Sequence, residues 1–66
     1  MTKMQEELYN FIKKFIKNNG CSPTIREIAA IFQRSTGTIY PRLQVLRKKG
    51  FIDFEEHKAR TIKILK

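Results

Sequence analysis

Side chains able to pair with a nucleic acid are concentrated between Arg34 and Lys48. Hydroxyl and amide groups in this stretch can hydrogen-bond base edges, and its Arg and Lys side chains can pair with phosphates. No Asp or Glu occurs between Glu27 and Asp53. A surface that is uncharged to positive and free of carboxylates suits the major groove of a duplex.

The same stretch has the pattern of a helix. Ser35 is a favourable N-cap, and the apolar residues Ile39, Leu43 and Leu46 follow at spacings of four and three. Gly50 follows three basic residues and is typical of a helix end. We therefore expect a helix over 35–49 with one buried stripe and a polar outer face.

Pro41 falls inside the predicted helix, where proline is unfavourable. It lacks an amide hydrogen and would crowd the carbonyl of Gly37, which costs roughly 3 kcal/mol in a helix interior. Either the helix kinks, or regular helix starts nearer Thr38, where a proline in the first turn is tolerated; the later start is the favoured interpretation. Gly37 then either allows the backbone to come close to DNA or only marks the start of the helix.

Two more helices precede this one. Thr2 and Gln5 have capping-box spacing, and Gly20 suits the left-handed position after the helix they begin. The apolar face of that first helix is formed by Leu8, Phe11, Ile12, Phe15 and Ile16. Thr24 and Glu27 form a second capping box, before a short helix whose buried side is Ile28, Ala29 and Phe32. The turn at 33–34 then completes a helix-turn-helix.

After Gly50 the apolar period changes from about 3.6 to 2. Strand-forming residues at 51–54 and 61–64 flank a polar loop at 55–60, which predicts a hairpin over 51–65. The fold class is therefore mainly α with a small β-hairpin, a three-helix winged helix-turn-helix, in a single domain over 1–66.

Composition limits the function. The chain has 66 residues and a net charge of +8, which favours polyanionic partners. One Cys (Cys21) and one His (His57) do not make a Cys/His metal set, and structural zinc is excluded unless subunits share it, so we expect no metal and no cofactor. No nucleophile with a paired base and no membrane-length apolar run is visible, so we expect no enzyme and a cytoplasmic location.

Three segments together resemble the N-terminal DNA-binding domain of LexA-family repressors. They are SPTIREIA, STGTIYPRLQVLRKKGFI and ARTIKIL, and they occur in the family's order over nearly the whole chain. The matching positions are Pro23, Thr24, Glu27, Ile28, Ala29, Ser35, Leu43, Leu46, Lys49, Gly50, Ile52, Arg60 and Ile62. The resemblance implies a winged helix-turn-helix that binds DNA.

Two departures accompany the resemblance. The protease domain that LexA proteins carry after this module, which also supplies dimerisation, is not found in these 66 residues. The segment GTIYP is closer to the Gly-Thr-x-Tyr-Pro of PadR-type winged-helix regulators. We therefore expect a monomer in solution, paired at most on DNA. Leu8, Tyr9 and Phe11, or the strand edge near Ile64, are the alternative surface for pairing.

The predicted function is sequence-specific binding of double-stranded DNA by a small transcriptional regulator, a repressor, with helix 35–49 in the major groove and hairpin 51–65 as the wing. The candidate DNA contacts are Arg34, Ser35, Thr36, Gly37, Thr38, Tyr40, Pro41, Arg42, Gln44, Lys48, Lys58 and Arg60. Gln44 is the expected reader of adenine, and Tyr40 either contacts DNA or packs against the first helix. The alternative is a winged helix for protein contacts, such as a phage or plasmid accessory protein, because Glu55 and Glu56 place negative charge at the wing.

Overall fold

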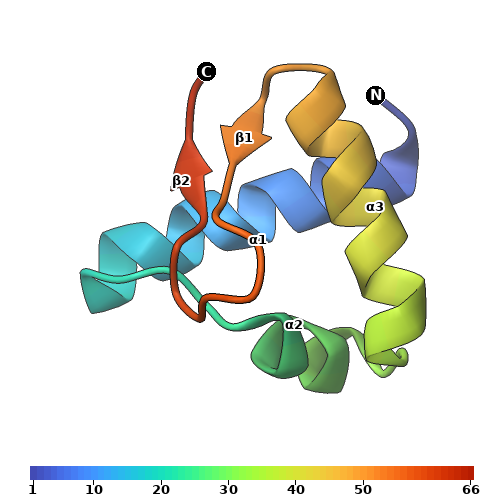
Figure 1. Cartoon of the computed structure of the whole chain (residues 1–66), viewed down its shortest axis with the longest axis horizontal. Coiled ribbons are helices and arrows are strands. Elements are labelled where there is room, and N and C mark those ends of the chain that lie inside the picture. Colours follow the sequence, from blue (N-terminus) through green and yellow to red (C-terminus); the bar gives the residue numbers. More distant parts are fainter.

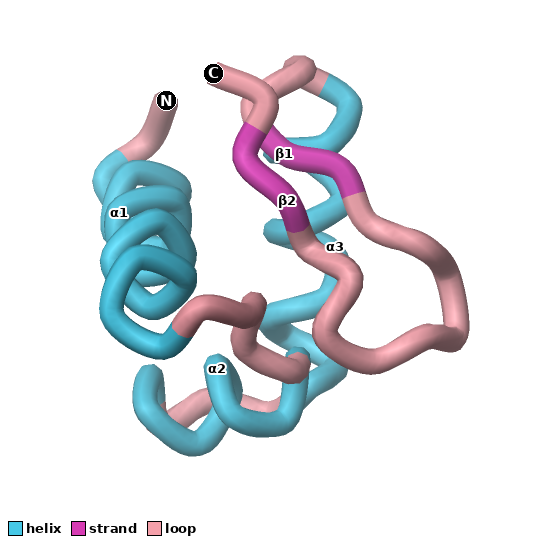
Figure 2. Tube along the Cα trace, turned by 90° about the vertical axis from the view of Figure 1, so that its left-hand side faces the viewer, coloured by secondary structure: helices cyan, strands magenta, loops and turns pink.

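Three helices are followed by a short β-hairpin in the computed structural model, which describes residues 1–66 (Figure 1). In chain order the elements are α1 (Lys3–Asn19), α2 (Ile25–Phe32), α3 (Thr36–Lys48), β1 (Ile52–Asp53) and β2 (Lys63–Ile64). The strands are antiparallel, with Ile52 opposite Ile64. Figure 2 shows α1 and the hairpin on opposite sides of the view, with the loop between the strands extending away from α1. The predicted winged helix-turn-helix is confirmed.

Both predicted capping boxes form. The Thr2 side chain accepts the amide of Gln5, and the Gln5 side chain accepts the amide of Thr2. Thr24 and Glu27 make the same reciprocal pair before α2. Each pair satisfies two amides that the first turn of a helix leaves without partners.

The turn between α2 and α3 forms without a glycine. Gln33 adopts a left-handed conformation with φ of 56°, and the amide of Arg34 donates to the carbonyl of Ala29 at 2.9 Å. These contacts close the end of α2 and let α3 begin two residues later. The predicted turn at 33–34 is therefore confirmed.

The expected late start of the third helix is wrong. Ser35 accepts the amide of Thr38 on its side chain, and its carbonyl accepts the amide of Ile39 at 3.1 Å, so helix begins at Thr36. Pro41 consequently lies inside the helix. The carbonyl of Gly37 has no helical hydrogen-bond donor, because Pro41 has no amide hydrogen. It lies on an exposed part of the chain where water can reach it.

The wing is less regular than the alternating sequence predicts. Only two residues of each strand pair, although strand-forming residues extend over 51–54 and 61–64. Side chains take the next backbone groups: the Asp53 carboxylate accepts the amide of Phe54, and the Thr61 hydroxyl accepts the amide of Glu55. These local bonds end the strand ladder early.

One core lies among the helices and under the hairpin. The core members of α3 and β1 are those predicted, Ile39, Leu43, Leu46 and Ile52, and each is 0% exposed. The rest of the core comes from α1, α2 and the loop between the strands, with Leu8, Tyr9, Ile12, Ile28, Ala29, Phe54 and Ile62. With a core this small, each of these residues is a substantial share of the stability.

The surface of α1 suggested for pairing two chains is largely unavailable. Leu8 is 0% exposed, and Tyr9 packs edge-on against Phe51 at 5.6 Å between ring centroids. The Tyr9 hydroxyl donates to the carbonyl of Lys66, which ties the end of the chain to α1. Leu8 and Tyr9 are therefore core residues and do not provide the alternative pairing surface. None of the three helices has the length and apolar character that a membrane span requires.

Replacing Leu43 with Ala should leave a cavity beneath α3 and lower the free energy of unfolding by roughly 2–5 kcal/mol. Val45→Ala in the same helix is the matched control, because Val45 is 38% exposed, and its effect should stay within about 0.5 kcal/mol. Thermal unfolding followed by circular dichroism measures both. Equal melting temperatures for the two variants would show that α3 is rotated differently about its axis.

Candidate nucleic-acid interface

Burial of one stripe of α3 determines which side chains face outward. Opposite Ile39, Leu43 and Leu46 lies an exposed or partly exposed surface that carries no acidic group. Of the predicted contacts, Gly37, Pro41 and Lys48 lie on it, Thr38 and Arg42 lie toward one edge, and Ser35 and Thr36 are exposed at the start of the helix. The structure thus leaves most of the predicted residues accessible on α3 or at its start.

A shallow hollow marks part of this surface. It lies between the start of α1 and α3 and is lined by Gln5, Gly37, Thr38, Pro41, Arg42 and Val45. The Ser35 and Thr38 hydroxyls are 3.1 Å apart at the start of α3. Hydroxyl, apolar and cationic groups are therefore available together, as base edges and phosphates require.

Val45 is a candidate contact that the sequence reasoning missed. It is 38% exposed and follows Gly37 and Pro41 at intervals of four, so the three lie along the outer side of α3. Its apolar type gave no indication of a DNA contact, but its spacing from Gly37 and Pro41 was a usable signal. A branched apolar side chain there suits the methyl group of thymine.

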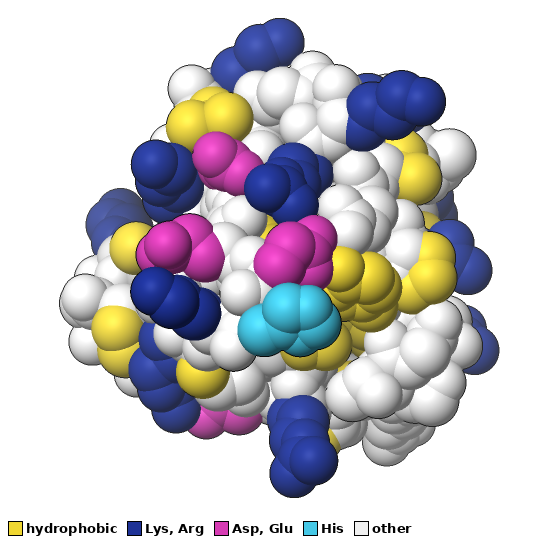
Figure 3. Space-filling view, in the orientation of Figure 1, with side chains coloured by type: hydrophobic (Ala, Val, Ile, Leu, Met, Phe, Trp, Pro, Cys, Tyr) yellow, Lys and Arg dark blue, Asp and Glu magenta, His cyan; other side chains and the backbone are white.

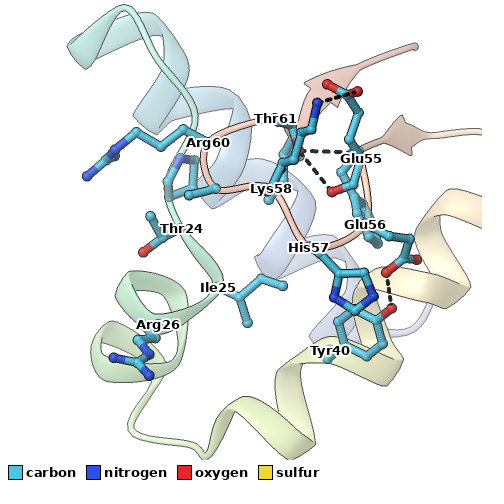
Figure 4. A pocket seen from close by; sticks show the side chains of 14 residues that line it. Thr24, Ile25, Arg26, Tyr40, Glu55, Glu56, His57, Lys58, Arg60 and Thr61 are labelled. Carbon is cyan, nitrogen blue, oxygen red and sulfur yellow. Dashed lines mark hydrogen bonds and ion pairs between the residues drawn. The ribbon is translucent and has the colours of Figure 1, made fainter.

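A second side of α3 faces the wing. Tyr40 packs edge-on against Phe54 of the wing, with 6.2 Å between ring centroids, rather than against α1. Its hydroxyl donates to the Glu56 carboxylate, as Figure 4 shows. The Gln44 amide nitrogen donates to the Tyr40 hydroxyl at 2.7 Å and to Glu56 at 2.9 Å. Both predicted DNA contacts therefore have partners in the wing loop.

Arg47 completes this contact between α3 and the wing. Its guanidinium donates to Glu56 at 2.9 Å and to Asp53 at 3.0 Å, and it lies 4.8 Å from the centroid of the Phe54 ring. The hydrogen bond from Tyr40 is the main cause that lowers the pKa of the Glu56 carboxyl, and the hydrogen bond from Gln44 lowers this pKa further. The bond to Glu56 correspondingly raises the pKa of the Tyr40 hydroxyl, and partial burial adds to it.

Arg60 has a structural partner that the sequence analysis did not foresee. Its guanidinium makes a two-pronged pair with Glu27, at 3.1 and 3.0 Å, and donates to the Ser22 carbonyl at 3.1 Å. The amide of Ile62 also donates to the Ser22 hydroxyl at 3.2 Å. Arg60 therefore fastens the wing to the start of α2, and much of its charge is compensated by Glu27.

The other predicted phosphate contacts remain available. Arg34, Arg42 and Lys48 are exposed and take no part in the four ion pairs of the protein. Lys58 makes only a loose pair with Glu55, at 3.9 Å between highly exposed groups. Figure 3 shows acidic atoms interspersed with basic atoms on the face that carries the wing.

Three helices, the third with an exposed polar side and a hairpin fastened beside it, define a winged helix-turn-helix protein. Residues 1–61 match the LexA DNA binding domain, and the chain therefore belongs to that family. The resemblance noted from the sequence is confirmed.

Individual relatives agree with this assignment. The chain is 46% identical over 66 residues to a LexA repressor of Caldicellulosiruptor saccharolyticus, covering 98% of this chain and 33% of that protein. A LexA repressor of Clostridium kluyveri is 42% identical over 62 residues, covering 92% and 31%. One from Staphylococcus aureus is 38% identical over 66 residues, covering 98% and 32%. The chain spans about a third of the length of these curated relatives.

The Glu27–Arg60 contact should make stability depend on pH. The hydrogen bond from the amide of Thr24 is the main cause that lowers the pKa of the Glu27 carboxyl below its ordinary 4.5, and the bond from Arg60 lowers this pKa further. Folding thus favours the ionised form of Glu27. The contribution of the Glu27 carboxylate to the free energy of unfolding is therefore complete above about pH 4.5 and is lost as the pH falls through the lowered pKa. Glu27→Gln should lower the melting temperature at neutral pH. On acidification, the melting temperature of this variant should fall less than that of the parent.

Glu7→Gln is the matched control, because Glu7 is an exposed carboxylate of α1 that makes no ion pair. Melting curves at a series of pH values compare the three proteins. If Glu27→Gln and Glu7→Gln behave alike, the contact between the wing and α2 does not contribute to stability.

Proposed function

We propose that this domain binds double-stranded DNA sequence-specifically, with α3 in the major groove and the wing, residues 51–65, beside the backbone. The observation that carries the proposal is the acid-free outer side of α3, whose direction is fixed by the buried stripe behind it. Membership of the LexA DNA binding domain family supports it. An α-helix with small polar side chains at its start fits the major groove.

The residues divide between two tasks. Base edges are met from the outer side and the start of α3 by the uncharged residues Ser35, Thr36, Gly37, Thr38, Pro41 and Val45. From the side of α3 that faces the wing, Gln44 and Tyr40 are the further candidate base contacts. Phosphates are met by Arg34, Arg42, Lys48 and Lys58, which supply affinity without sequence information. Arg60 acts by positioning the wing. The domain thus acts as a binding module, and no catalytic group is assigned to it.

The proposed role is repression of transcription, through occupancy of a DNA site by this domain. The relatives in Caldicellulosiruptor saccharolyticus, Clostridium kluyveri and Staphylococcus aureus are named LexA repressors. We propose the same role in the cytoplasm for this chain, one domain per half-site. Its net charge of +8 opposes association in free solution, so two copies come together only when a duplex holds both.

Affinity for duplex DNA should fall steeply with salt. If the four cations each neutralise one phosphate, the slope of log affinity against log salt is about −4. Arg42→Ala should reduce the slope by about one unit for every sequence, whereas Lys14→Ala on α1 should leave it unchanged. Fluorescence anisotropy with a labelled duplex measures the slope, and sedimentation without DNA checks that the protein is monomeric.

Sequence specificity is tested separately, by selecting bound duplexes from a random pool. A common site in the selected duplexes is expected. Equal affinity for every sequence, or equal affinity for an unrelated polyanion such as heparin, would contradict the proposed function.

Gly37 offers a test that separates binding from folding. A Cβ built at Gly37 meets only the Ser35 hydroxyl, at 3.8 Å, so the fold does not require glycine there. Gly37→Ala should raise the stability by up to about 1 kcal/mol, since alanine favours helix. It should nevertheless weaken binding to the selected site more than to random duplex, because the added methyl group stands between α3 and the groove.

Melting curves and binding titrations measure the two effects of Gly37→Ala on the same protein. Unchanged affinity together with higher stability would mean that the backbone at Gly37 does not approach DNA closely.

A further inference from the structure

The amide nitrogen of Gln44 has both of its hydrogens engaged within the protein. It donates to the Tyr40 hydroxyl at 2.7 Å and to one carboxylate oxygen of Glu56 at 2.9 Å. The Tyr40 hydroxyl donates its own hydrogen to the other carboxylate oxygen of Glu56, so it must accept from Gln44. Because an ionised carboxylate only accepts hydrogen bonds, the nitrogen of Gln44 and not its oxygen must face Glu56.

The carbonyl oxygen of Gln44 is left for an outside partner. It makes no hydrogen bond within the protein, and no buried side-chain oxygen or nitrogen lacks a partner, so this oxygen is reached by solvent. Gln44 lies one turn after Tyr40 on the partly exposed side of α3. The group that this residue offers to a bound duplex is therefore a hydrogen-bond acceptor.

Glu56 is itself held in place. The Arg47 guanidinium donates at 2.9 Å to the same oxygen of Glu56 that accepts from Gln44, and it also binds Asp53 at 3.0 Å. Three residues of α3 at successive turns, Tyr40, Gln44 and Arg47, thus converge on one carboxylate of the wing loop. Its negative charge is compensated where it stands, which keeps it beside α3 when DNA approaches.

We infer that Glu56 is a specificity-determining residue, which sets the base that Gln44 reads by holding the Gln44 amide with its carbonyl oxygen outward. This inference rests on the proposed function. A free glutamine binds adenine at two points, with its nitrogen donating and its oxygen accepting. With the nitrogen engaged by Glu56, Gln44 recognises only a base amino group, that of cytosine or of adenine. Glu56 acts through Gln44 and is a positioning residue.

The test compares two substitutions in the same loop. Glu56→Ala removes the acceptor of the Gln44 amide, whereas Glu55→Ala removes the same charge from a neighbour whose one ion pair is the loose contact with Lys58. Bound sites are selected from a random duplex pool with the parent and with each variant. Gln44→Ala identifies the base pair that Gln44 contacts, as the position where preference is lost. Circular dichroism verifies that each variant is folded.

The parent should accept cytosine or adenine at that position. Glu56→Ala should shift the preference toward adenine by on the order of tenfold, as two-point recognition becomes possible, while Glu55→Ala keeps the parent's preference. An unchanged preference in Glu56→Ala, an equal shift in Glu55→Ala, or no position affected by Gln44→Ala would overturn the inference and leave the proposed function intact. A parent that selects no common site would overturn the proposed function itself.

A measurement on the free parent tests the contact without DNA and without any variant. The side-chain amide resonances of Gln44, observed by nuclear magnetic resonance, should move as Glu56 is protonated on acidification, because Glu56 then loses its charge as acceptor. Resonances that stay fixed through that titration would show that the amide of Gln44 is not held by Glu56, and would overturn the inference.

Discussion

Burial of Ile39, Leu43 and Leu46 fixes the rotation of α3 about its own axis, and the rest of the surface depends on it. Each of these side chains is 0% exposed, so the helix cannot turn without opening the only core. The side facing the wing then consists of Tyr40, Gln44 and Arg47, and the outer side is left for a ligand. One apolar stripe thereby determines the contacts of two other sides of the helix.

Side chains rather than a strand ladder hold the wing against the helices. The two strands share only two residue pairs, which is too little for an independently stable hairpin. Arg60 fastens one part of the loop to Glu27, and Glu56 fastens another to Arg47 and its neighbours on α3. Such partly exposed ion pairs are individually weak, so the wing is expected to open before the helices do.

Local signals in the sequence predicted local structure well. The capping pairs Thr2–Gln5 and Thr24–Glu27 depend on residues three apart, and the buried stripe depends on helical spacing, so both could be predicted. The Arg60–Glu27 and Glu56–Gln44 contacts join residues 33 and 12 positions apart, and tertiary packing alone brings them together. For the same reason, which predicted site residues face the wing and which face outward could not be known beforehand.

The division of charge on α3 bears on what kind of partner it suits. Arg34 and Lys48 lie at the two ends of the outer side and Arg42 lies toward one edge, while its centre, Gly37, Pro41 and Val45, is small and uncharged. The central contacts of protein interfaces are enriched in aromatic residues, and the one aromatic side chain of α3, Tyr40, is packed on the wing. A duplex instead has phosphates at the borders of its groove and base edges between them. The arrangement of α3 therefore matches a groove better than the face of an acidic protein.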